Sequence, residues 1–120
     1  MIKKLRSQRL QLEELIQIYD LKTNEIIGHV LDINHQGLGV FIAHDLSNKQ
    51  IMEIRLKLIK QNKCIQYIDL ITKVCWCKKS SKLQNHIAGL KIETIINTKS
   101  KMRFEDLLQS LYQIKSEKIA

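Results

Sequence analysis

A compact polar turn and two arginines carry most of the recognisable chemistry in this sequence. The turn reads Asp-Ile-Asn-His-Gln-Gly over residues 32–37, and Arg6 and Arg9 lie in the basic segment before it. A guanidinium can pair with the O6 and N7 edge of guanine, stack on its face or neutralise a phosphate. A carboxylate or an amide accepts hydrogen bonds from N–H groups of the base, and glycine lets the backbone approach closely with positive φ. These residues therefore point to a site for a compact ligand that carries guanine and phosphate.

Strand-like runs surround this turn and must position it. Residues 52–58 alternate apolar and charged side chains, which is the pattern of a half-buried strand. Residues 20–25 form a polar turn in which Asn24 suits a left-handed backbone, so the runs on either side are expected to form a hairpin. The predicted strands are residues 12–19, 26–33, 38–42, 52–58, 65–77 and 86–92.

The C-terminal segment changes to a helical period. Ser100 is predicted to cap a helix over about 100–117 that packs across an open end or a face of the strands. Six antiparallel strands and one helix indicate a mainly β protein, a small barrel with a C-terminal α-helix. We expect one domain over residues 1–120, with an arm at 1–11 and the barrel at 12–95. The apolar face of the helix comprises Phe104, Leu107, Leu108, Leu111 and Ile114.

The order of these elements and motifs resembles the PilZ domain family of bacteria, whose fold is a six-stranded split β-barrel. Members carry an RxxxR motif in an N-terminal arm and a [D/N]xSxxG motif between two barrel strands. Residues 32–37 occupy the second motif, and their distance from Arg9 fits the family. Val74-Cys75-Trp76 resembles the Val-x-Trp strand of the family, and residues 87–92 resemble its late Ile-Gly-Val-x-Phe strand with one extra residue.

The sequence departs from the family motifs at two positions. Leu5 stands where the first arginine of RxxxR is expected, Arg6 makes the motif RxxR, and Lys4 lies one residue further out than Leu5. Asn34 replaces the serine of the second motif.

The usual ligand of the family is the second messenger cyclic di-GMP, and the resemblance implies a receptor or effector module that passes its level to a protein partner. In this reading Arg6 and Arg9 clamp guanine and phosphate, Asp32 and Asn34 read a guanine edge, and Gly37 permits the turn. The ligand-binding residues so implied are Arg6, Arg9, Asp32, Asn34 and Gly37, with Lys4 and His35 as possible additions.

Two other functions stay open from the sequence. The first is one that the resemblance permits, a nucleotide-independent adaptor of a pilus or flagellar system, in which Asp32 and Asn34 only organise a turn through side-chain-to-backbone bonds. The second is a nonspecific nucleic-acid binder whose lysines, Lys57 and Lys73 among them, form a phosphate-binding face. Aromatic residues are only 5% of the chain and no strand shows a stacking pair, so nucleic acid is the less favoured partner. No nucleophile motif, carboxylate pair or phosphate loop indicates an enzyme.

The composition is that of a soluble globular protein with a preference for anionic partners. The 120 residues are 44% hydrophobic and 27% charged, with a formal net charge of +8 and a pI near 9.5. No run is long and apolar enough to span a bilayer, and the basic start is not a secretory signal. An odd count of three cysteines without framework spacing indicates a reducing compartment, so we expect a cytoplasmic protein.

We expect the cysteines and the tryptophan to have structural rather than functional roles. Cys75 and Cys77 are two apart, so a regular strand would place both on one face. Together with Cys64 and His86 they match no established zinc spacing, and we expect ordinary half-buried thiols with no metal and no cofactor. Trp76 is expected to share a face with Val74 and Leu70 and to pack in the core.

Overall fold

The computed structural model describes residues 10–11, 15–60, 62–79 and 85–119, with side chains for the parts of these ranges between 15 and 113. Within these ranges no helix combines the length and the apolar character that crossing a membrane requires. The elements are β1 (Leu10–Gln11), β2 (Gln17–Asp20), β3 (Ile26–Ile33), β4 (Gly37–Ile42), β5 (Ile51–Ile59), β6 (Ile65–Lys79), β7 (His86–Ile95) and α1 (Thr98–Ile119).

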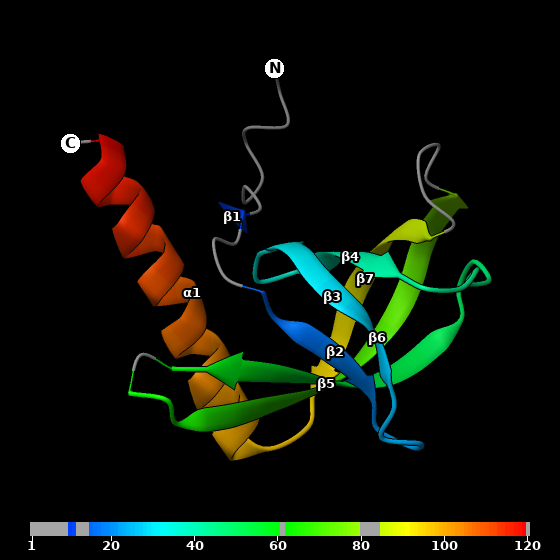
Figure 1. The fold of residues 1–120 in the computed structure, drawn as a ribbon, viewed down its shortest axis with the longest axis horizontal. Coiled ribbons are helices and arrows are strands. Elements are labelled where there is room, and N and C mark those ends of the chain that lie inside the picture. The colour runs from blue at the N-terminus through cyan, green and yellow to red at the C-terminus, as the bar shows by residue number, and fades with distance from the viewer. Residues whose placement is uncertain (1–9, 12–14, 61, 80–84, 120) are drawn as a thin grey trace.

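Strands β2 to β7 close into a six-stranded antiparallel barrel, which confirms the predicted fold class. Around the barrel the order is β2-β5-β6-β7-β4-β3, and β3 closes the ring by pairing with both β2 and β4 (Figure 1). The two-residue strand β1 is an addition that the sequence did not predict. It pairs with the end of β3 beyond β2, where Leu10 lies opposite Ile33 and Gln11 opposite Asp32.

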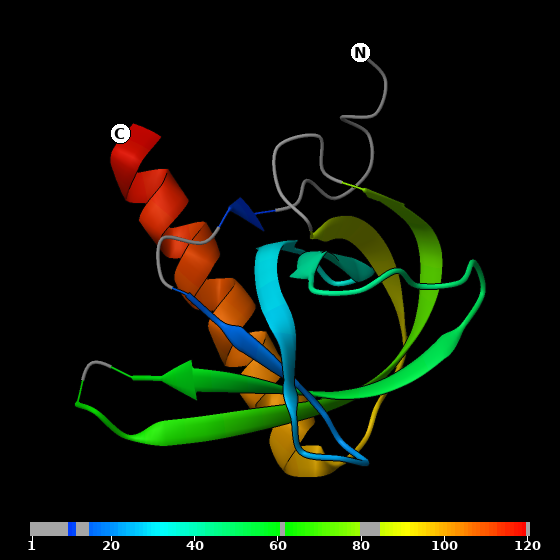
Figure 2. The ribbon, with the colours of Figure 1, turned by 45° about the vertical axis from the view of Figure 1, so that its right-hand side comes forward.

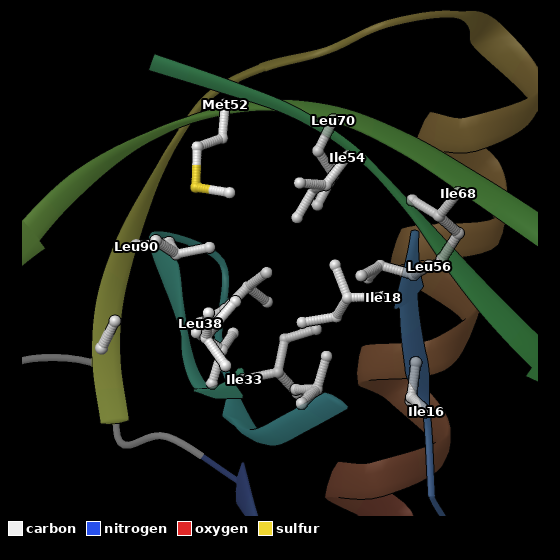
Figure 3. Close-up of a cluster of buried hydrophobic side chains, with 14 of the residues drawn as sticks. Ile16, Ile18, Ile33, Leu38, Met52, Ile54, Leu56, Ile68, Leu70 and Leu90 are labelled. Atoms are coloured by element: carbon white, nitrogen blue, oxygen red, sulfur yellow. The ribbon is translucent and has the colours of Figure 1, made fainter. Parts of the chain in front are cut away.

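The barrel closes around a core built by alternating side chains. In β5 the even-numbered residues from Met52 to Leu58 are buried while Ile51, Glu53 and Ile59 are exposed, as the sequence predicts. Figure 3 shows the inward side chains of β2, β3, β4, β5, β6 and β7 meeting in one cluster. Removing this apolar surface from water is the main stabilising contribution to such a small barrel.

Helix α1 packs against β6 and β7 (Figure 2). It begins at Thr98, and Asn97 caps it, because Asn97 Oδ1 accepts from Ser100 N–H at 2.7 Å. The prediction that Ser100 is the cap was therefore wrong. Ser100 is buried, and its Oγ instead accepts from Asp69 N–H of β6 at 2.9 Å. Phe104 and Leu108 bury the predicted apolar face.

The bounds of several strands differ from those predicted. The first strand is β2 and begins at Gln17 rather than at residue 12, and residues 12–14 lie outside the described residues. The hairpin after it is as predicted, with Asn24 at φ 63°. β6 and β7 run further than expected because they pair with each other as far as Lys79 opposite His86 and Leu70 opposite Ile95. The predicted loop from residue 78 therefore starts later.

A β-bulge in β6 overturns the predicted position of the tryptophan. Val74 lies opposite Leu90 and Trp76 opposite Gly89, so Cys75 is an extra residue between two consecutive pairs. An inserted residue inverts the facing of every later side chain. Trp76 is consequently 41% exposed on the outer surface instead of packed in the core, and Cys77, not Cys75, packs against the core. The prediction that both cysteines share a face was wrong for the same reason.

We predict that Ser100→Ala lowers the free energy of unfolding by about 1–3 kcal/mol, because it leaves the Asp69 N–H without its hydrogen-bond acceptor in a part-buried position. The measurement is urea denaturation followed by circular dichroism. Ser110→Ala, at an exposed position of the same helix, controls for the gain in helix propensity. Equal unfolding midpoints for the two variants would contradict the role assigned to Ser100.

Candidate functional site

Asn34 shapes the turn between β3 and β4 with its own side chain. Its Oδ1 accepts from Gln36 N–H at 2.8 Å and from Gly37 N–H at 2.9 Å, while its backbone N–H donates to Gly37 O at 3.0 Å. Only 4% of Asn34 is exposed. Such bonds mimic a backbone turn, so this oxygen is engaged in holding the loop rather than pointing at solvent.

Gly37 does not adopt the positive φ that we predicted for it. No glycine within the described ranges has positive φ, and Gly37 already opens β4, opposite Lys91 of β7. The chain has reversed before this residue, at His35 and Gln36, because the Asn34 side chain supplies the bonds that close the turn.

Asp32 lies on the outer side of β3, directly against a glycine of the next strand. It is opposite Gly39 in the register of β3 and β4, and a Cβ added at Gly39 would lie 2.5 Å from Asp32 Oδ1. Real Cβ atoms do not approach another atom so closely, so glycine at position 39 is what allows the carboxylate to rest there.

Trp76 repeats this arrangement on β6, three strands away from Asp32 in the barrel. It is opposite Gly89 of β7, and a Cβ added at Gly89 would collide with the indole ring. Gly89 is in turn opposite Gly39 of β4. Trp76, Gly89, Gly39 and Asp32 therefore form one row across four adjacent strands, which we call the glycine row. An aromatic ring and a carboxylate lie on the outer surface at its two ends.

Cations flank the glycine row. Lys78 Nζ lies 5.8 Å from the centroid of the Trp76 ring, and the next outward positions of β6 and β7 are Lys73 and Lys91, which lie opposite each other. Within a strand, positions two apart are separated by about 7 Å, so Lys91 is within one nucleotide's reach of Gly89. Like charges at facing positions repel, and an anion bound between them would relieve that repulsion.

The predicted arm enters the structure beside Asp32. Gln11 of β1 is opposite Asp32, and Leu10, the chain neighbour of Arg9, is opposite Ile33. Arg6, Arg9 and Lys4 themselves lie outside the described residues, and their roles stay predictions.

His35 connects the turn to helix α1. Its Nε2 lies 3.3 Å from Glu105 Oε1, and its ring stacks on Tyr112 and meets Phe104 edge-on, each at a centroid distance of 6.5 Å. The side chain remains 47% exposed. The sequence analysis named His35 as a possible addition to the ligand site, and the sequence contains no signal for this contact with a helix 70 residues later.

The cysteines do not form a metal site among the described residues, where no cluster of three histidine, cysteine or acidic side chains could hold an ion. Cys64 and Cys75 are exposed. Burial raises the pKa of the Cys77 thiol, whose Sγ lies 3.5 Å from Asp45 Oδ1, so this group stays protonated at neutral pH.

Sequence reasoning assigned no binding role to three members of the glycine row, namely Gly39, Gly89 and Trp76. Gly89 and Trp76 lie in segments that resemble strands of the family, but the outward direction of Trp76 depends on the bulge at Cys75. The structure brings Asp32, Asn34 and Gly37 together on one turn, with Asp32 outside and Asn34 buried.

Comparison with known proteins agrees with this fold. The family model described as "PilZ domain" matches residues 4–110. No curated protein matches. Among solved structures, this chain is similar to the Bacillus subtilis Inhibitor of motility (MotI/DgrA), with a TM-score of 0.66 and 17% sequence identity. The match covers 94% of this chain and 52% of that one, so this chain spans about half the length of its structural neighbour. At this identity the likeness concerns the fold.

We predict that Gly39→Ala destabilises the protein by about 1–3 kcal/mol, because the new methyl group has no room beside the Asp32 carboxylate. Unfolding of wild type, Gly39→Ala, Asp32→Ala and the double variant forms a double-mutant cycle. The cost of Gly39→Ala should fall in the Asp32→Ala background, where the carboxylate is gone. An identical cost in both backgrounds would show that the two residues are not in contact.

Proposed function

This chain belongs to the PilZ domain family, and we propose that it is a receptor for cyclic di-GMP that passes the level of this second messenger to a protein partner. The observation that carries the proposal is the glycine row, which sets Trp76 and Asp32 on one outer face beside the strand that follows Arg9. A module of this kind binds and signals, and it needs no catalytic residue. A cytoplasmic location is part of the proposal, since the dinucleotide is a bacterial second messenger.

The glycine row and the lysines beside it offer the contacts that a guanine nucleotide needs. The exposed Trp76 ring can stack on a base, which contributes about 1–3 kcal/mol per base. The Asp32 carboxylate can accept from the N–H groups of guanine, whereas the other bases do not present the same pair of donors. Lys73 and Lys91 can neutralise phosphate oxygens.

The arm completes the proposed site. Arg6 and Arg9 would clamp guanine and phosphate from the segment that leads into β1, with Lys4 as a further cation. Asn34 and Gly37 would contribute by holding the turn, since both already take part in its hydrogen bonds. His35 would contact a base from the turn, or would transmit a change in the turn to helix α1 through its contact with Glu105.

Titration calorimetry with cyclic di-GMP tests the proposal. Trp76→Ala should weaken binding roughly 5- to 150-fold if a base stacks on the ring. Arg9→Ala should weaken it roughly 10-fold or more if a charge-assisted bond to the ligand is lost. Tyr67→Ala removes an aromatic ring of similar exposure, 38% against 41%, and should bind as wild type does. Absence of binding heat, or equal affinities for Trp76→Ala and Tyr67→Ala, would contradict the proposal.

A nucleotide-independent adaptor is the second candidate. Leu5 replaces an arginine of the family motif, and Asn34 Oδ1 is engaged in the turn. The structural neighbour is named as an inhibitor of motility, which makes a motility or pilus apparatus a reasonable source of partners to test. This function predicts that a partner is captured equally well with and without the dinucleotide. Strictly ligand-dependent capture would exclude it.

A further inference from the structure

The end of the β5–β6 hairpin projects beyond the barrel. β2 pairs with β5 as far as Gln17 opposite Lys57, and β7 pairs with β6 only from Leu70 onward. Between these limits and the turn, β5 and β6 pair with each other alone, as far as Ile59 opposite Ile65. Figures 1 and 2 both show this two-stranded ribbon extending past the other strands.

The projecting ribbon exposes apolar side chains on its outer face. Ile59 is 56% exposed and Ile65 is 47% exposed, and they are cross-strand partners. Tyr67, 38% exposed, follows on the same face. The opposite face is occupied, since Leu58 and Ile68 are buried in the core. The barrel therefore does not need the exposed pair for its packing, and grouped apolar side chains on a surface indicate an interaction site.

The same region is uniformly basic. Residues 54–68 contain no aspartate or glutamate, and Lys57, Lys60 and Lys63 form no ion pair with any described residue. The remaining cation, Arg55, is neutralised by two hydrogen bonds to Asp69, at 2.7 and 3.0 Å. Three uncompensated lysines thus surround two exposed isoleucines. We call this set, namely Lys57, Ile59, Lys60, Lys63, Ile65 and Tyr67, the hairpin end.

The turn that carries the hairpin end is held by its own hydrogen bonds. Lys60 N–H donates to Cys64 O and Lys63 N–H donates to Lys60 O, both at 2.8 Å, and Asn62 Oδ1 accepts from Cys64 N–H at 3.0 Å. Behind it, the Arg55 guanidinium lies 5.0 Å from the centroid of the Tyr67 ring, and Arg103 Nη1 donates to Tyr67 O. A surface that is already ordered loses little conformational entropy when it binds.

We propose that the hairpin end docks this protein on a bilayer surface rich in anionic phospholipid. Ile59 and Ile65 would enter the boundary between headgroups and acyl chains, and Tyr67 would lie at headgroup level, where aromatic rings with a polar tip are favoured. The lysines would contact phosphate and other anionic headgroup oxygens. An acidic peptide is the competing occupant. A peptide that adds to a free edge of β5 or β6 would pair with the backbone, whereas Ile59, Ile65 and Tyr67 lie on one face of the ribbon, which a bilayer surface can cover without strand pairing.

This docking surface is separate from the glycine row. Tyr67 and Trp76 lie nine positions apart on β6, which is about 30 Å of strand. Membrane docking therefore does not depend on the proposed nucleotide site. An experiment can contradict either proposal without contradicting the other.

Co-sedimentation of the full chain with vesicles, without nucleotide, tests the inference. Vesicles of phosphatidylcholine alone are compared with vesicles containing a third phosphatidylglycerol, at low and at high salt. We expect binding to the anionic vesicles that weakens with salt, and little binding to phosphatidylcholine. Replacing Lys57, Lys60 and Lys63 by Gln should lower the partition coefficient about fivefold per lysine. Ile59→Ser with Ile65→Ser should reduce it at least tenfold.

The chain provides matched controls for both variants. Ile26 and Ile51 are 55% and 57% exposed, so replacing both by Ser removes equally exposed isoleucines elsewhere on the barrel. Replacing the exposed Lys22, Lys49 and Lys79 by Gln gives the same change of net charge. Circular dichroism establishes that every variant is folded.

Three results would overturn the inference. The first is no sedimentation with anionic vesicles. The second is that each hairpin-end variant loses no more binding than its matched control, which would mean that net charge and general surface hydrophobicity, not this surface, are responsible. The third is that poly-glutamate binds with the same dependence on Ile59 and Ile65 while vesicles do not, which would assign the surface to an acidic protein.

Discussion

One inserted residue in β6 determines which side chains form the outer face that carries the proposed nucleotide site. Cys75 breaks the alternation of a strand that otherwise directs Ile68, Leu70 and Val74 into the core. The break turns Trp76 outward over Gly89, a position where a Cβ would collide with its ring. A regular β6 would instead have directed Trp76 into a core that is already filled, and the outer face would have lost its aromatic ring.

The two glycines of the glycine row, on adjacent strands, each leave room for a side chain of the neighbouring strand. Gly39 and Gly89 face each other, and each lacks the Cβ that would displace the Asp32 carboxylate or the Trp76 indole. The turn beside them is fixed from within by Asn34 and from outside by the contact of His35 with helix α1. Because these groups are placed by backbone pairing and not by long flexible side chains, the face is largely formed before any ligand arrives.

The sequence predicted the barrel well because its signals are periodic. Alternation over residues 52–58 and the helical spacing of Phe104 and Leu108 depend on local order alone. The predictions failed where one backbone irregularity or one side-chain hydrogen bond decides. Trp76 follows a bulge and therefore points outward. Ser100 binds the backbone of β6, while Asn97 caps the helix. The turn after β3 is closed by the Asn34 side chain and does not need the positive φ expected of Gly37. The ligand roles of the arm residues stay predictions, since the described residues begin at Leu10.

The central claim is that the glycine row binds the guanine nucleotide with Trp76 against a base, and this chain allows a direct optical measurement. Trp76 is its single tryptophan, so fluorescence excited at wavelengths where the three tyrosines do not absorb reports this position alone. Titration with cyclic di-GMP should give a saturable quenching of that emission, with GMP at equal concentration giving much less. Saturable binding by calorimetry that leaves the emission of Trp76 unchanged would contradict the account, because the ligand would then lie away from the glycine row.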